Sequence, residues 1–253
     1  MVSLSAKDIS VVIEGKEIVR DTTLSVTGGE LVVVIGPNGA GKSTLVKAMA
    51  GTIEPNAGEI LLDDRKLSDL STTERARKLS YLPQARSLAW PLFVEDMVAL
   101  GRHPWGAASH RLGDRDAEAV AQAIKVVDID HLRKRRTDTL SGGEMARAHL
   151  ARCLATEAPL LLADEPLTAL DPLHQWQCMA IFKDYVDHGE GALIVMHDLT
   201  LAARFASRLV WMADGNIVAD GPPSETMTEA RLADVYGVRA RVDEGGVTVL
   251  GAI

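Results

Sequence analysis

The sequence predicts an α/β fold: a mostly parallel central sheet with an N-terminal antiparallel β-subdomain and an inserted helical subdomain. Residues 31–35 form an apolar, β-branched run, typical of a strand buried on both faces. Further apolar runs at residues 160–163, 192–196 and 209–212 alternate with helix-compatible stretches, the pattern of right-handed βαβ units. Residues 86–157 lack long strand patterns, which predicts that they are mostly helical.

The two ends of the chain predict shorter strands. Residues 2–27 alternate apolar and polar side chains around a turn signal at residues 14–16, which predicts a β-hairpin. Residues 60–62 precede two aspartates and predict another strand and turn. Residues 216–221 and 238–249 predict short strands around a helix.

Length and composition fit one globular domain over residues 1–253. The chain is 47% apolar and 25% charged, which are ordinary values for such a domain. We expect residues 1–85 and 158–253 to form the core with its β-subdomain, and residues 86–157 to form the helical subdomain.

Charge and hydropathy favour a cytoplasmic protein. The net charge of −8 argues against a general nucleic-acid binder. No apolar run approaches the roughly 20 residues that span a bilayer, and the first residues show no signal-peptide pattern. Any membrane role would therefore need a separate membrane subunit.

Three residue groups favour structural interpretations. Cys153 and Cys178 are too few for a disulfide framework and fit a reducing compartment. His149 and His174 each precede a cysteine by four residues, a metal-ligand spacing, but two ligands do not close a site and packed helix is favoured. The basic run at residues 133–136 favours a solvated face over a nucleic-acid contact.

The loop after the first buried strand predicts a phosphate-binding site. It matches the pattern G-x-x-x-x-G-K-S, and a helix-compatible stretch follows it. Glycines let the backbone approach phosphates, and a helix N-terminus adds partial positive charge. We expect Lys42 to bind the β- and γ-phosphates and the Ser43 hydroxyl to ligate Mg²⁺. The predicted nucleotide-binding residues are Gly36, Pro37, Asn38, Gly39, Ala40, Gly41, Lys42, Ser43 and Thr44.

Two carboxylates follow the apolar run at residues 160–163. The carboxyl end of such a strand lies at the sheet edge where open α/β folds bind ligands. We expect Asp164 to hold magnesium, directly or through water, and Glu165 to act as a general base on an attacking water. The alternative interpretation of these two carboxylates is a helix cap or surface turn. The phosphate-binding loop elsewhere in the sequence favours the catalytic interpretation.

A second helix start carries paired glycines. Ser141 and Glu144 form a capping-box pattern, and Gly142 and Gly143 behind the serine leave an N-terminus exposed to an anion. Residues 140–144 match the signature motif of ABC-type ATPases, and the order of the motifs also matches. The chain therefore resembles that family over nearly its whole length.

This resemblance implies further site residues, with ATP and Mg²⁺ as cofactors. Gln84 resembles the Q-loop glutamine, which senses magnesium and the attacking water. Asp171 resembles the D-loop aspartate, which communicates between two sites, and His197 resembles the switch histidine at the γ-phosphate. In this family one nucleotide lies between two subunits, so the signature residues would act on the site of a second copy. These residues are Ser141, Gly142, Gly143 and Glu144.

Two positions depart from the family pattern. Ile13 stands where most members carry an aromatic residue that stacks on adenine, which predicts weaker base selectivity. Ala163 stands where leucine is usual, a difference that we expect to change packing alone.

A segment before the signature motif indicates a branch of the family. Residues 98–105 contain Gly-Arg-His-Pro, similar to the Gly-Arg-x-Pro segment in ATPases of importers for iron-siderophore complexes, haem and cobalamin. Residues 174–175, 197–203 and 235–237 fit the same branch. Residues 87–92 favour the haem members slightly.

The resemblance implies an ATP-hydrolysing subunit of an importer, peripheral on the cytoplasmic face of the membrane. Its partners would be a second copy, a polytopic permease that contacts the region of residues 86–110, and indirectly a substrate-binding protein, but no nucleic acid. The alternatives are a soluble ABC ATPase of iron-sulfur cluster assembly, a nucleic-acid-associated ABC protein and an exporter subunit.

Overall fold

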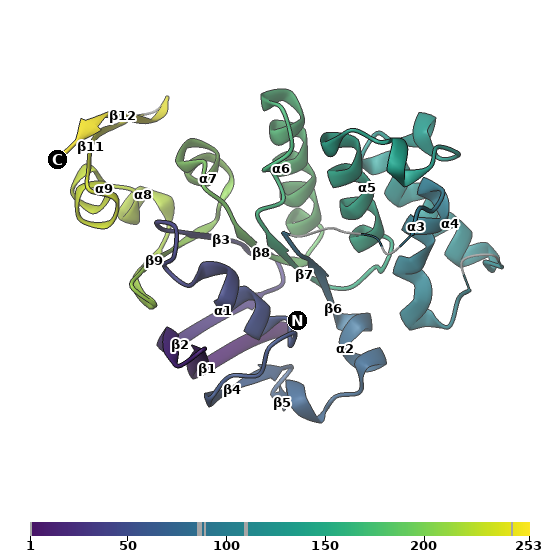
Figure 1. Ribbon diagram of the computed structural model, residues 1–253, viewed down its shortest axis with the longest axis horizontal. Helices are drawn as coiled ribbons and strands as arrows, with labels where there is room; N and C mark the ends of the chain where they lie inside the picture. Colours follow the sequence, from purple (N-terminus) through teal and green to yellow (C-terminus); the bar gives the residue numbers. More distant parts are fainter. Residues whose placement is uncertain (1, 85–87, 89, 109–110, 244) are drawn as a thin grey trace.

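A mostly parallel six-stranded sheet forms the centre of the molecule, as predicted (Figure 1). The computed structural model describes residues 2–84, 88, 90–108, 111–243 and 245–253. Five neighbouring strands are parallel, and the sixth pairs antiparallel at one edge. In spatial order the strands are β10 (Asn216–Gly221), β9 (Arg208–Ala213), β3 (Leu31–Ile35), β8 (Gly191–Val195), β7 (Leu160–Asp164) and β6 (Leu79–Leu82).

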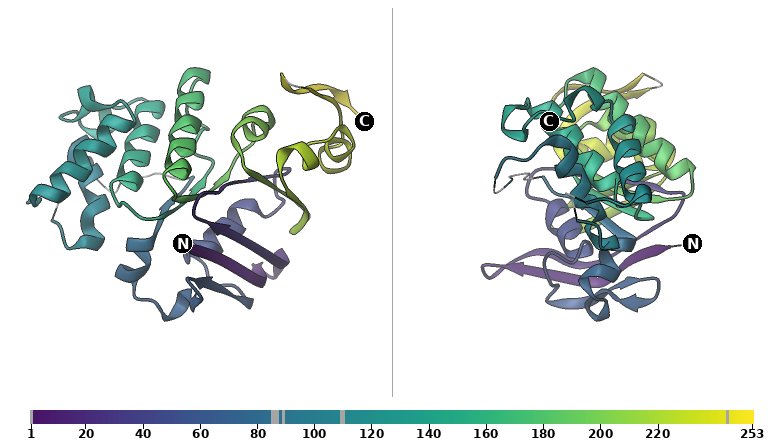
Figure 2. Two further views of the ribbon diagram at one scale, coloured as in Figure 1. Left: turned by 180° about the vertical axis from the view of Figure 1, so that it is seen from behind. Right: turned by 90° about the vertical axis from the view of Figure 1, so that its right-hand side faces the viewer.

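Side chains of the central strands alternate between two cores. In β3, Leu31, Val33 and Ile35 belong to one hydrophobic cluster, whereas Val32 and Val34 belong to the other. All five are buried, because layers cover both faces of the sheet. Figures 1 and 2 show the helix α1 on the side facing the β-subdomain and the helices α6 and α7 on the other side. Their bounds are α1 (Lys42–Met49), α6 (Pro172–Asp187) and α7 (Leu199–Phe205).

The N-terminal hairpin is confirmed. Its strands pair antiparallel, and Glu14 and Gly15 form the two-residue turn with positive φ angles of 50° and 78°, which match the twist of a hairpin. The hairpin belongs to a four-stranded antiparallel sheet. In spatial order its strands are β2 (Lys16–Thr27), β1 (Ser3–Ile13), β4 (Ala57–Leu62) and β5 (Arg65–Lys66).

The helical region is also as expected, within the described residues. The elements α3, α4 and η2 contact α5, and apolar side chains of α3, α4, η3 and α5 join the larger core. The proposed boundaries at residues 85/86 and 157/158 remain a prediction. The elements are α3 (Val94–Ala99), the 3₁₀ segment η2 (Leu100–Trp105), α4 (Asp114–Val126), η3 (Asp130–Leu132), η4 (Thr137–Thr139) and α5 (Gly142–Leu154).

The sequence analysis did not predict the elements between β5 and β6. The segment η1 (Leu67–Asp69) leads to α2 (Thr72–Lys78), which has no buried residue and therefore no apolar stripe to reveal it. Ser71 begins α2 with a complete capping box, in which the Ser71 side chain accepts from the Glu74 N–H and the Glu74 carboxylate accepts from the Ser71 N–H.

The C-terminal prediction of one helix between short strands is wrong in one respect. Two helices, α8 (Pro223–Thr226) and α9 (Glu229–Tyr236), lie between β10 and the last hairpin, because Thr228 caps a separate helix start. The hairpin consists of β11 (Val238–Asp243) and β12 (Gly246–Ala252). Among the helices that the structure describes, not one combines the length and the apolar character that a membrane crossing requires.

Candidate nucleotide site

The loop between β3 and α1 approaches neighbouring backbone so closely that two of its glycines cannot be replaced. A Cβ atom on Gly36 would lie 2.1 Å from the Met212 carbonyl oxygen. A Cβ atom on Gly41 would lie 2.6 Å from the Ile18 carbonyl oxygen, and Gly41 has a φ of 98° at the N-cap of α1. The first-turn N–H groups of α1 begin at this loop, and the free N–H groups of a helix N-terminus favour anions.

Lys42 lies folded into this loop. Its side chain is buried, and Nζ donates to the carbonyl oxygens of Gly36 at 2.8 Å and Pro37 at 2.9 Å. Burial lowers the pKa of Lys42, while the charges of Glu165 and Asp164 oppose that shift. The carbonyl contacts hold a cation beside the loop, where it can neutralise phosphate oxygens.

Ser43 and Asp164 meet at the end of β7. The Ser43 hydroxyl donates to Asp164 Oδ1 at 2.8 Å, although the two residues lie far apart in the sequence. Asp164 is completely buried, and its Oδ2 has no hydrogen-bond partner among the described residues. Burial raises the pKa of this carboxyl group. A hydroxyl and an unsatisfied buried carboxylate oxygen are ligands that fit Mg²⁺.

Glu165 lies at the centre of a cluster of side chains. Gln84 Nε2 donates to its Oε2 at 2.8 Å, and His197 Nε2 lies 2.7 Å from its Oε1. The Thr168 hydroxyl lies 3.3 Å from Oε2 and 3.2 Å from the Glu165 carbonyl oxygen. Glu165 itself has a φ of 49°, an uncommon conformation for a non-glycine residue. The structure thus brings the three predicted catalytic residues together.

A cavity of about 210 Å³ lies beside this cluster. Glu165, Thr168, Gln175 and His197 contribute to its lining, so a water molecule there has several polar partners. The sequence analysis missed Thr168 and Gln175. The position of Thr168 three residues after a proposed base was the one signal that could have identified it.

The signature residues begin α5 and lie against the D-loop of the same chain. Ser141 accepts from the Glu144 N–H at 3.2 Å, while the Glu144 carboxylate accepts from the Ser141 N–H at 2.7 Å. A Cβ atom on Gly143 would lie 3.3 Å from the Ala169 carbonyl oxygen. No hydrogen bond between residues 141–144 and residues 36–44 occurs within the described part of the chain.

Two further predicted site residues have well-defined positions but no established nucleotide contact. Asp171 caps α6, where its Oδ1 accepts from the His174 N–H at 3.0 Å. Ile13 is 44% exposed at the end of β1, next to the hairpin turn. An exposed apolar side chain there is available for a contact with a base.

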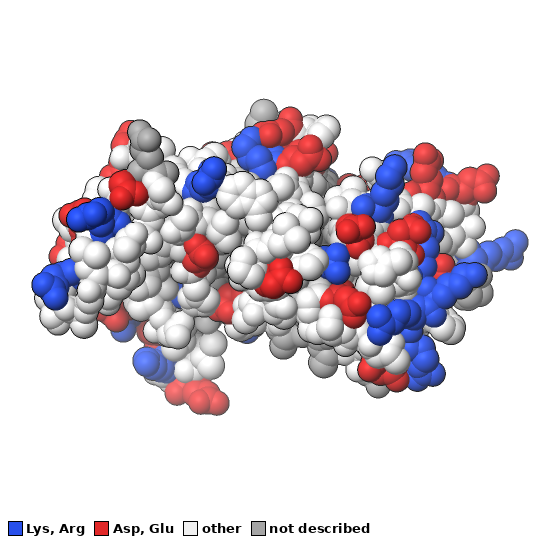
Figure 3. Space-filling view, turned by 90° about the horizontal axis from the view of Figure 1, so that it is seen from above, with Lys and Arg blue, Asp and Glu red and all other residues white. Residues whose placement is uncertain are grey.

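The basic run at residues 133–136 is largely paired with carboxylates. Arg133 pairs with Asp130, Arg135 with Glu144 and Arg136 with Asp138, at 2.8, 3.3 and 3.1 Å. Figure 3 shows acidic and basic side chains intermixed at the helical end of the molecule. These pairs support the solvated face and not a phosphate-backbone contact.

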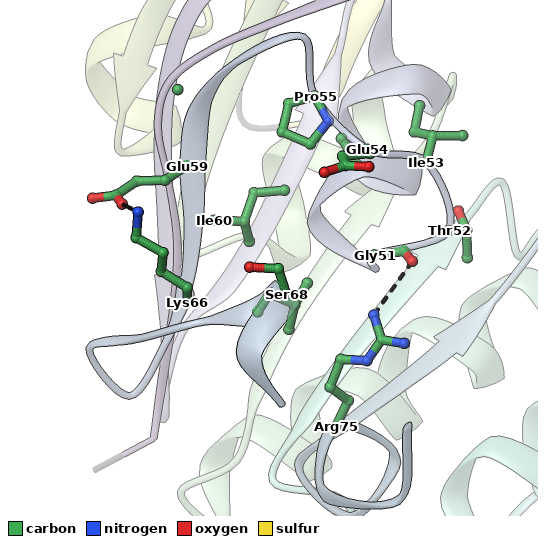
Figure 4. A pocket seen from close by; sticks show the side chains of 13 residues that line it. Gly51, Thr52, Ile53, Glu54, Pro55, Glu59, Ile60, Lys66, Ser68 and Arg75 are labelled. Carbon is green, nitrogen blue, oxygen red and sulfur yellow. Dashed lines mark hydrogen bonds and ion pairs between the residues drawn. The ribbon is translucent and has the colours of Figure 1, made fainter. Parts of the chain in front are cut away.

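A second cavity, of about 480 Å³, lies at the opposite end of α1 (Figure 4). Glu59 and Lys66 form an ion pair of 3.1 Å across its rim, and an Arg75 guanidinium nitrogen lies 3.5 Å from the Gly51 carbonyl oxygen. None of the predicted site residues lines it.

Comparison with known proteins agrees with this geometry. The family model described as "ABC transporter" matches residues 19–168, more than half of the chain. The hemin import ATP-binding protein HmuV of Rhodococcus jostii is 38% identical, over 98% of this chain and 84% of that protein. The protein of the same name from Pseudomonas aeruginosa is 40% identical, over 94% of each chain.

Solved structures show the same fold. An ATP-binding subunit of an ABC transporter is 27% identical, with a TM-score of 0.77 over 93% of this chain and 94% of that one. The dimeric bacterial ABC transporter cassette MJ0796 is 25% identical, with a TM-score of 0.78 over 87% of this chain and 98% of that one. The loop between β3 and α1, the acidic residues at the end of β7 and the signature residues at the start of α5 are the motifs that this family shares. The chain therefore belongs to the ABC transporter family and is one of its ATP-hydrolysing subunits.

Proposed function

We propose that this chain powers the import of haem through a separate membrane permease. The observation that carries the catalytic part is the cluster of Gln84, His197 and Thr168 around Glu165 at the end of β7. The cargo is supported by the relatives named hemin import ATP-binding proteins, which are about 40% identical over most of the chain. Iron-siderophore complexes and cobalamin remain alternatives within the same branch.

Each site residue has a role that its contacts support. Lys42 would leave the carbonyl oxygens of the loop and bind the β- and γ-phosphates. Glu165 would accept a proton from the attacking water, and Gln84 and His197 would orient that water and the carboxylate. The contacts of Gln84 and His197 with Glu165 support a shared role of the three side chains in positioning that water.

Magnesium fits the same site. Ser43 and Asp164 would hold the ion, with Gln84 at its edge, and the unpartnered Oδ2 of Asp164 supports this assignment. When bound, Mg²⁺ would neutralise charge on the β- and γ-phosphates. Release of the Ser43 hydroxyl from Asp164 would free both oxygen ligands together.

A second copy would complete the site. The exposed N-terminus of α5 with Gly142 and Gly143 is suited to binding an anion, but it lies against the D-loop of its own chain. The similarity to a dimeric cassette supports a sandwich in which each signature faces the other copy's nucleotide. The closed dimer would bind the permease at the cytoplasmic face of the membrane, with a substrate-binding protein delivering cargo from the other side.

Two soluble alternatives have less support. A nucleic-acid-associated protein would present unpaired basic side chains, whereas three of the four cations at residues 133–136 pair with carboxylates. An ATPase of iron-sulfur cluster assembly would lack the Gly-Arg-x-Pro segment. Copurification with a polytopic membrane protein would favour the importer, whereas soluble partners or RNA would favour an alternative.

Uptake of labelled haem tests the cargo. Cells that lack this chain would take up little haem, and the wild-type chain would restore uptake, because hydrolysis at Glu165 drives transport. Glu165→Gln would not restore it. The same cells are measured with ferric siderophores and labelled cobalamin.

Two results would contradict the haem assignment. Loss of siderophore or cobalamin uptake with normal haem uptake would move the chain to another cargo of the branch. Unchanged uptake of every cargo would exclude a metal-chelate importer, while leaving the ATPase itself intact.

Base selectivity tests the position of Ile13. An exposed isoleucine packs on a base but does not stack as an aromatic ring does, so we expect similar Michaelis constants for ATP and GTP. Ile13→Tyr would lower the constant for ATP relative to that for GTP. A strong ATP preference of the wild-type chain would contradict a contact between Ile13 and the base.

A further inference from the structure

The C-terminal hairpin packs on α7, the helix that begins at Leu199, two residues after His197. An isolated two-stranded hairpin is at most marginally stable in water, so its position depends on neighbours. The Ile253 N–H closes the base of the hairpin by donating to the Gly237 carbonyl oxygen at 2.9 Å. Val242 and Val247 pack against the large core from the two strands. The hairpin thus lies in contact both with α7 and with the large core.

One hydroxyl connects α7 to β12 with two contacts. The Val247 N–H donates to Thr200 Oγ1 at 3.1 Å, and the same hydroxyl lies 3.4 Å from the Val247 carbonyl oxygen, to which it donates. A hydroxyl can accept and donate at once, as neither a methyl group nor an ammonium group can. Thr200 lies in the first turn of α7, so these contacts fix the end of the helix next to His197.

Gly246 makes this contact tight. A Cβ atom on Gly246 would lie 2.4 Å from Thr200 Cγ2 and 2.8 Å from Thr200 Oγ1, and Gly246 has a φ of 121°. Any other residue at this position would push Thr200 away. The absence of a side chain on β12 thus lets the threonine reach the strand backbone.

The first turn of α7 is also tied to the residue that follows His197. Asp198 accepts from the Leu201 N–H through its side chain at 2.8 Å and from the Ala202 N–H through its carbonyl oxygen at 3.0 Å. The helix has seven residues, too few to be stable without tertiary contacts. A shift of its first turn would therefore move Asp198 and the adjoining His197.

We propose that Thr200 is a positioning residue for His197: it ties α7 to β12 and so fixes the imidazole beside Glu165. The inference rests on the proposed role of His197 in hydrolysis. It makes the C-terminal hairpin part of the catalytic apparatus, although the hairpin contributes no group to the nucleotide site. Displacement of a catalytic group by about 1 Å can lower a rate by about a hundredfold.

Nuclear magnetic resonance of the histidine side chains tests the position directly. The His197 imidazole signal of the full chain is assigned by its loss in His197→Ala. We expect Thr200→Val, which removes the hydroxyl at nearly constant shape, to shift this signal, whereas Thr200→Ser would leave it near its wild-type position. Leu250→Ser is the control: Leu250 lies on β12 and is 60% exposed, so its replacement should leave the His197 signal unchanged.

Steady-state kinetics give the second readout. Thr200→Val should lower kcat about tenfold with the KM for ATP within about twofold, because the nucleotide contacts stay in place. Gly246→Ala disturbs the same contact from the β12 side and should likewise lower kcat with little change in KM. Thr200→Ser should recover most of the lost kcat. Thermal unfolding of each variant confirms that the chain is folded.

The outcomes separate this proposal from the proposed function. An unshifted His197 signal in Thr200→Val, or a kcat equal to that of the wild type, overturns the positioning role. A shifted His197 signal in Thr200→Val together with a wild-type signal in Thr200→Ser supports the positioning role. If His197→Ala keeps full ATPase activity, the proposed role of His197 fails instead, whatever Thr200→Val does.

Discussion

We expect Glu165→Gln to lower kcat for ATP hydrolysis about a thousandfold while ATP still binds. A general base contributes roughly 10²- to 10⁴-fold, and the amide has no basic oxygen for the proton of the water. Gln84 and Thr168 still have a carbonyl oxygen to contact, so the cluster keeps its shape. Phosphate release measures kcat, and fluorescence of a labelled nucleotide measures binding.

A second carboxylate provides the control for this prediction. Glu225 lies on α8 outside the nucleotide site, and Glu225→Gln should keep the wild-type rate. If Glu165→Gln retained more than about a tenth of the rate, another group would be the base. If it lost nucleotide affinity as well, Glu165 would be required for the structure of the loop.

We expect Gly101→Ala to lower the free energy of unfolding by about 3 kcal/mol. A Cβ atom at this position would lie 2.3 Å from the Arg152 carbonyl oxygen and 3.1 Å from Ala155 Cβ, so η2 must move away from α5. The midpoint of thermal unfolding should fall by roughly 6–12 °C in a chain of this size. Circular dichroism with heating measures this shift.

Gly113→Ala is the matched control in the same helical region. The nearest atom to its added Cβ would be an Asp116 carboxylate oxygen at 3.9 Å, and its φ is ordinary. We expect a change within about 1 kcal/mol. Equal losses in the two variants would show that the close approach of η2 and α5 is not what Gly101 provides.

The Gly-Arg-x-Pro segment that indicated a branch of the family connects neighbouring elements through hydrogen bonds. Arg102 is 1% exposed, and it donates to Asp116 and Glu157 at 2.8 Å and to the Ala155 carbonyl oxygen at 2.7 Å. The Pro104 carbonyl oxygen accepts from Arg77 Nε of α2 at 2.8 Å. The segment thus joins the helical region to the core. The predicted permease contact around residues 86–110 includes this segment and stays a prediction.

Three strands of the central sheet, β3, β7 and β8, could be predicted because they are buried on both faces and therefore continuously apolar. The strand β6 was not predicted, because its four residues include Ser80 and Tyr81 and form no such apolar run. The P-loop was predictable because Gly36 and Gly41 are required by backbone contacts that only glycine allows. The polar helix α2 has no such pattern. Its capping box, formed by Ser71 and Glu74, is the local signal in the sequence that indicates its start.

The site could be predicted only in part, because its contacts join distant segments. Gln84 and Glu165 lie 81 residues apart, and their approach depends on the pairing of β6 with β7. Resemblance to a family placed them, and local patterns did not. The direction of Thr168 depends on the φ of Glu165, which sequence alone does not show. The cues taken from Ser87 and Ala89 lie outside the described residues.

The backbone at Glu165 also bears on how this chain can change over generations. Its φ of 49° is a conformation that glycine and asparagine adopt at less cost than glutamate. Selection for stability alone would therefore favour losing the carboxylate. The chain thus has glutamate at a position where the backbone conformation disfavours it, and the rest of the fold must supply the free energy that holds this conformation.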